Sequence, residues 1–96
     1  MLDMMEVRRI VNSAALSALK KIDVSTVLSE PSVDSDGNNA LSVTIVMKNG
    51  SLKRMNGDLA PDTIVRIRHD LDEAGEERTP IVYSSTEREL EQDGGR

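Results

Sequence analysis

The chain contains one histidine, His69, whose imidazole could transfer protons or bind a metal near neutral pH. At helical spacing Asp72 and Glu73 follow it by three and four residues, so both carboxylates would lie beside the ring. Such a group could serve a small hydrolytic or metal-dependent enzyme. The alternative, which we favour, is a solvated helix face on which bases pair with the acids four residues later. These pairs would be Arg66 with Asp70 and Arg68 with Asp72.

The segment Ser32–Gly37 has oxygen-bearing side chains at alternate positions followed by glycine, as in a calcium-binding loop. That loop begins with aspartate and has a bidentate glutamate at its twelfth position, where this chain has Ser32 and Val43. We therefore predict a hairpin turn here and no metal ligand.

Other catalytic patterns are missing from the sequence. It has neither a Gly-x-Ser-x-Gly nucleophile motif nor a glycine-rich phosphate loop. Its clustered carboxylates, at 70–77 and 87–93, occur on segments that we expect to be solvated, whereas acid–base catalysis uses carboxylates in a sheltered cleft. We expect no enzyme, no catalytic residue, no metal and no cofactor.

Composition narrows the remaining classes of function. The 96 residues include no cysteine, so disulfides and thiolate metal sites are excluded. Tyr83 is the single aromatic residue, which excludes an aromatic stacking platform for single-stranded nucleic acid. The N-terminus is acidic and no apolar run reaches the length of a membrane span, so we expect a cytoplasmic protein without membrane contact.

The net charge of −5 is unevenly distributed along the chain. Residues 70–93 hold nine acids and two bases, whereas residues 42–69 hold five bases and two acids. An acidic C-terminus of this kind could contact a basic partner or cover the protein's own basic stretch.

Hydrophobic periodicity predicts an α+β fold, a two-layer α/β sandwich of order α-β-β-α-β with a short C-terminal helix. The three strands should form one mainly antiparallel sheet, beginning with a hairpin. We expect a single domain over residues 1–91 and a flexible tail at 92–96. The expected elements are a helix at 4–21, strands at 24–30, 40–48 and 80–85, a helix from 58 or 60 to about 74, and a short helix from Thr86 to about Gln92.

Capping residues support the predicted helices near both ends of the chain. Asp3 with Glu6 and Thr86 with Glu89 each match a capping box, and Gly75 should end the second long helix. That helix should bury Ala60, Ile64, Ile67, Leu71 and Ala74.

If both long helices cover one face of the sheet, the other face is open to a partner. Leu41, Val43, Ile45 and Met47 alternate with the set Ser42, Thr44, Val46 and Lys48, and we expect Val82 and Ser84 to share the open face with one of these sets. The predicted interaction surface comprises Lys48, Lys53, Arg54, Arg66, Val46 and Val82.

The order of elements over residues 4–85 resembles the small RNA-binding domains of the KH type. This resemblance implies an RNA- or ribosome-associated module that binds through the basic stretch. The Gly-x-x-Gly loop of that family is missing, and its nearest counterpart is Gly57-Asp58-Leu59-Ala60. Our preferred hypothesis is a non-catalytic protein-interaction or accessory domain that binds a protein partner or itself as a homodimer. Nucleic acid is the alternative partner.

Overall fold

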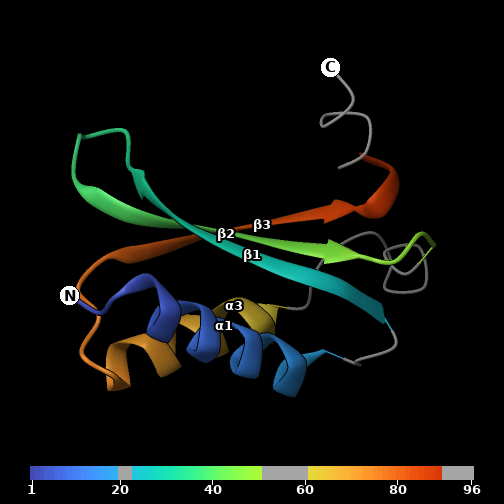
Figure 1. The fold of residues 1–96 in the computed structure, drawn as a ribbon, viewed down its shortest axis with the longest axis horizontal. Coiled ribbons are helices and arrows are strands. Elements are labelled where there is room, and N and C mark those ends of the chain that lie inside the picture. The colour runs from blue at the N-terminus through green and yellow to red at the C-terminus, as the bar shows by residue number, and fades with distance from the viewer. Residues whose placement is uncertain (20–22, 51–60, 90–96) are drawn as a thin grey trace.

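The computed structural model in Figure 1 describes residues 1–19, 23–50 and 61–89. Its elements follow the predicted α+β order. They are α1 (Met4–Ala18), β1 (Val24–Val33), β2 (Asn39–Met47), α3 (Pro61–Glu73) and β3 (Thr79–Thr86), after which a helical turn begins at Glu87. Among these described residues, no helix is long and apolar enough to cross a membrane.

The two long helices begin and end where local chemistry requires. Asp3 caps α1 by accepting a hydrogen bond from Glu6 N at 2.9 Å, as predicted. The predicted end at residue 21 is wrong, because Leu19 is already extended and its side chain is buried. α3 begins with Pro61, which lacks the N–H that a first helical turn leaves unpaired. Gly75 ends α3 with a φ of 89°, a conformation that costs glycine little.

The segment between β1 and β2 is the predicted hairpin turn. Asp34 Oδ1 accepts from the backbone N–H groups of Asp36 and Asn38, both at 2.9 Å. Gly37 adopts a φ of 86° and donates to the Asp34 carbonyl at 3.0 Å. The calcium-like spacing of Ser32–Gly37 therefore stabilises a turn, because the Asp34 side chain binds backbone N–H groups.

The sheet has the order β1-β2-β3. β1 and β2 form the expected antiparallel hairpin, whereas β3 runs parallel to β2 because α3 crosses from the end of β2 to the start of β3. β1 continues through Pro31, where we had expected it to stop. Proline is tolerated there because β1 is an edge strand, on which the N–H groups of alternate residues have no neighbouring strand to donate to. From the sequence, residues 51–55 could form a loop or a weak edge strand, and they lie outside the described residues.

Both helices cover the same face of the sheet (Figure 1). The alternation along β2 is as predicted, since Leu41, Val43, Ile45 and Met47 are all fully buried against the helices. From the helix side this core includes Val7, Val11 and Ala14 of α1 and Ile67 and Leu71 of α3.

The predicted apolar stripe of α3 is correct at its centre and wrong at one end. Ile67 and Leu71 are buried and Ile64 is half-buried, but Ala74 is exposed because it lies in the turn after Glu73, the last residue of α3. Thr63 is fully buried instead, and Ala60 lies outside the described residues.

We predict that Ile67→Ala lowers the free energy of unfolding by about 2–5 kcal/mol, because it removes buried methyl groups and leaves a cavity. The matched control on the same helix is Val65→Ala, whose side chain is 64% exposed and which should change stability by less than about 0.5 kcal/mol. Urea denaturation followed by circular dichroism measures both. Equal losses of unfolding free energy in the two variants would contradict the burial of Ile67 in the core.

Candidate functional site

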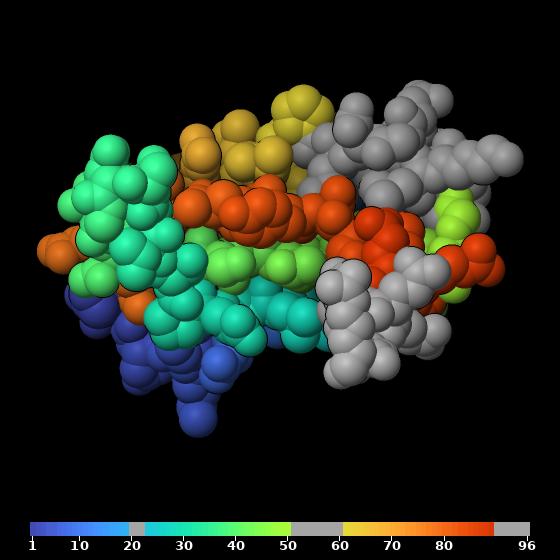
Figure 2. Space-filling view, turned by 90° about the horizontal axis from the view of Figure 1, so that it is seen from above, coloured from blue at the N-terminus to red at the C-terminus, as the bar shows by residue number. Residues whose placement is uncertain are grey.

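α1 and α3 do not cover the opposite face of the sheet, which is called the open face below, and strand register decides which side chains this face carries (Figure 2). Leu28 of β1 pairs with Thr44 of β2, which pairs in turn with Tyr83 of β3, so these residues form one row across the face. The neighbouring rows are Thr26–Val46–Ser85, Glu30–Ser42–Ile81 and Ser32–Ala40–Thr79.

This open face is poor in charge. Glu30 is the one charged residue among its twelve, although 30% of the chain is charged. Its largest apolar side chains remain accessible, with Leu28 40% and Tyr83 53% exposed. Small hydroxyl-bearing residues occupy most of the other positions. The face therefore combines accessible apolar area with hydroxyl groups, which cost far less to desolvate than charged groups do.

The structure does not bring Val46 and Val82 to one face. Val46 lies in the open-face row with Thr26 and Ser85, but it is only 1% exposed. Val82 pairs with Val43 and packs against the buried core beneath the helices. The expectation that Val82 and Ser84 share the open face with Val46 is therefore wrong, because the parallel register with β2 directs Ile81 and Tyr83 there instead.

The described basic residues of the predicted surface lie in different layers. Lys48 directly follows β2 and is exposed. Arg66 belongs to α3, where its Nε donates to Asp70 Oδ2 at 3.2 Å, as predicted. Lys53 and Arg54 lie outside the described residues.

The beginning of the second acidic cluster, at 87–93, is attached to the end of the sheet where β2 finishes. Glu87 Oε2 accepts from Ser25 Oγ at 3.0 Å, and Arg88 N donates to Asn49 Oδ1 at 3.2 Å. The predicted capping box is confirmed, because Thr86 Oγ1 accepts from Glu89 N while Thr86 N donates to the Glu89 carboxylate. The first acidic residues thus lie at the same end of the sheet as Lys48.

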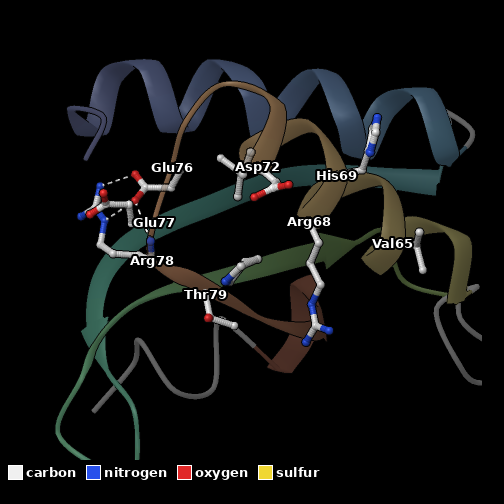
Figure 3. Close-up of a pocket in the computed structure, with 10 residues that line it drawn as sticks. Val65, Arg68, His69, Asp72, Glu76, Glu77, Arg78 and Thr79 are labelled. Atoms are coloured by element: carbon white, nitrogen blue, oxygen red, sulfur yellow. Dashed lines mark hydrogen bonds and ion pairs between the residues drawn. The ribbon is translucent and has the colours of Figure 1, made fainter.

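His69 and its neighbouring carboxylates lie on an exposed part of α3. His69 Nε2 is 4.0 Å from Glu73 Oε1, and their side chains are 63% and 71% exposed. No group of three metal-ligating side chains occurs within residues 1–19, 23–50 and 61–89. The predicted pairing of Arg68 with Asp72 is not formed in this part of the chain either. Arg68, His69 and Asp72 instead line a groove between α3 and the start of β3 (Figure 3).

One end of this groove is closed by a buried ion pair that the sequence analysis missed. Glu76 Oε1 accepts from Arg78 Nη2 at 2.8 Å, and Glu76 Oε2 accepts from Arg78 Nε at 3.1 Å. Leu2 joins the pair through both backbone groups, because its N–H donates to Glu76 Oε1 and its carbonyl accepts from Arg78 Nη2. The N-terminus is thereby attached to the loop that precedes β3.

Glu76 is buried and its side chain is 0% exposed, which corrects the expectation that residues 70–77 are all solvated. The hydrogen bonds from the Arg78 side chain lower the pKa of Glu76 to about 2, against the opposing effect of burial. The available sequence signal was an acid and a base two residues apart, directly after the glycine that ends α3.

Comparisons of the chain with protein-family models, with curated proteins and with solved structures give no match. The class that fold and surface define is a two-layer α+β domain whose sheet is covered on one face and open on the other.

We predict that Glu76 makes stability depend on pH. Its pKa is lower in the folded chain, at about 2, than the value near 4.5 of a free carboxyl group. The ionised Glu76 carboxylate therefore adds up to about 3 kcal/mol to the free energy of unfolding. This contribution is complete above pH 4.5 and is lost as the pH falls toward 2. In urea unfolding from pH 7 to pH 2, Glu76→Gln should be less stable than the wild type at neutral pH, and this difference should shrink in acid. Glu77→Gln, at an exposed neighbour, is the control. If the wild type and Glu76→Gln differed in stability by the same amount from pH 7 to pH 2, the lowered pKa of Glu76 would be refuted.

Proposed function

We propose that this chain is a non-catalytic protein-interaction domain that binds through the open face of its sheet, and that a second copy of the chain occupies this face. The observation that carries the proposal is the charge-poor surface around Leu28, Thr44 and Tyr83. The cores of protein interfaces are depleted in charged residues and enriched in tyrosine, which matches this composition.

A second copy suits this surface because the central row is self-complementary. A two-fold axis along β2 would place Leu28 of each copy opposite Tyr83 of the other, with the two Thr44 residues at the centre. Two sheets that pack face to face lie about 10 Å apart, a separation that these side chains can fill. Glu30, the one charged residue of the face, lies one row along the axis from this centre and would lie opposite Ile81 of the other copy.

The size of the face sets the expected strength of self-association. Three strands spaced about 4.8 Å apart, with about eight residues at 3.3 Å each, cover roughly 400 Å². A stable interface buries about 800 Å² on each partner. We therefore propose a weak dimer whose population depends on protein concentration.

The alternative, an RNA-binding module, would use the predicted basic surface. Lys48 and Arg66, its two described members, belong to different layers, and Arg66 already binds Asp70. The proposal therefore assigns the open face, and not the basic residues, to the main function.

We expect sedimentation equilibrium between about 10 μM and 1 mM to show a monomer–dimer equilibrium that weakens at least tenfold in Tyr83→Asp and in Leu28→Asp. A charge buried without a partner in the apolar centre would oppose association. The control is Met5→Asp, which makes a similar change at an 80% exposed residue of α1 and should leave the equilibrium unchanged.

Circular dichroism establishes that each variant is folded before its association is measured. Raising the salt concentration should not weaken a dimer held by uncharged surfaces. A wild type that stays monomeric at 1 mM, or a dimer equally weakened by Met5→Asp, would refute self-association through this face.

A further inference from the structure

The two edges of the sheet differ in how well their backbones are protected. β1 has a bulge between Val24 and Thr26 and contains Pro31. In addition, Arg8 Nε donates to the carbonyl oxygen of Ser29 at 3.3 Å and so occupies a backbone acceptor of β1. Bulges, prolines and covering side chains are devices that keep an edge strand from pairing with another chain. β1 is therefore a protected edge.

β3, the opposite edge, lacks such protection along its centre. No side chain among the described residues hydrogen-bonds to the backbone of residues 81–84. Its proline, Pro80, comes before this stretch, and its last residue, Thr86, is bonded to Glu89. Within residues 1–19, 23–50 and 61–89, no strand pairs with the backbone groups of residues 81–84 that point away from β2, so these groups can pair with a further strand.

α3 lies beside this free edge and extends beyond it, as the view onto the open face shows (Figure 2). The groove between helix and strand has a volume of about 450 Å³. In Figure 3, Arg68 extends from α3 toward the strands and Val65 lies near the beginning of the helix. Among the residues that line it are Val65, Arg68, Leu71 and Asp72 of α3, with Thr79 and Pro80 of β3.

We propose that this groove binds an extended segment of a partner protein, which pairs with β3 as a fourth strand. An extended peptide that adds to a sheet edge gains backbone hydrogen bonds, while pockets beside the edge select alternate side chains. Edge-to-edge pairing of two β3 strands is disfavoured, because α3 of each copy projects beyond its own edge and the helices would collide. The site is separate from the open face and goes beyond self-association.

The residues of α3 that line the groove determine which side chains the bound segment should carry. Arg68 and Asp72 form no ion pair with any other residue in the described part of the chain, and Val65 presents an exposed apolar side chain. Along α3 these three residues are separated by about 4.5 and 6 Å, close to the spacing of about 6.6 Å between alternate residues of a strand.

A segment antiparallel to β3 runs in the same direction as α3, because α3 runs opposite to β3 (Figure 1). The matching segment therefore reads apolar-x-acidic-x-basic from its N-terminus. Its acid would bind Arg68, its base would bind Asp72 and its apolar residue would cover Val65.

The test uses the full chain and two seven-residue peptides with blocked ends, Thr-Val-Thr-Glu-Thr-Lys-Thr and the charge-exchanged Thr-Val-Thr-Lys-Thr-Glu-Thr. Titration of the ¹⁵N-labelled protein to about 5 mM peptide is followed by NMR. We expect the first peptide to shift the amides of residues 65–72 and 81–84 and to bind about tenfold more tightly than the second. Methylation of its alternate backbone nitrogens should abolish binding, since those nitrogens would donate to β3.

The double variant Arg68→Asp/Asp72→Arg should reverse the preference between the two peptides. Arg66→Asp/Asp70→Arg makes the same exchange on the side of α3 that faces α1, and it should keep the wild-type preference. The proposal is overturned if neither peptide binds, if the wild type binds both equally, or if the shifted amides lie around Thr44 on the open face. Self-association measured on the same variants should be unchanged, so the two proposals can fail separately.

Discussion

Two amphipathic helices can cover only one face of a three-stranded sheet, and most features of this molecule depend on that constraint. α1 and α3 together bury the side chains of β2 from Leu41 to Met47. Because side chains alternate along a strand, covering one set leaves the other set without a layer above it. The open face around Thr44 and the two edges of the sheet are therefore consequences of how few helices and strands the described part of the chain provides.

The buried pair of Glu76 and Arg78 completes this arrangement at the end where α3 turns into β3. It connects Leu2 to a loop that is 74 residues away in the sequence, so the N-terminus and the last strand are positioned together. A buried carboxylate is costly unless it is well paired, and here four hydrogen bonds from N–H groups of Arg78 and Leu2 surround it. The pair also closes the groove beside β3 at one end.

The sequence predicts the local elements well because their signals are local. Capping residues, turn residues and the alternation along β2 each identify an element without reference to the rest of the chain. The orientation of β3 is different, because residues 80–85 contain an apolar side chain on both faces. Val82 and Tyr83 are equally compatible with the pattern, and only pairing with β2 decides that Tyr83 is on the open face. The burial of Glu76 likewise depends on the distant Leu2.

The contrast between the two edges is an argument that the groove beside β3 is functional. An exposed edge strand favours aggregation, and β1 carries three features that prevent pairing, including the hydrogen bond from Arg8. β3 carries none of these between residues 81 and 84, yet α3 projects beside it and limits which chains can approach. The projecting α3 keeps the edge of a second sheet away from β3, whereas a single extended segment can enter the groove between α3 and β3. Such selective access restricts pairing to a ligand whose charges match Arg68 and Asp72, so the edge discriminates among partners without being blocked.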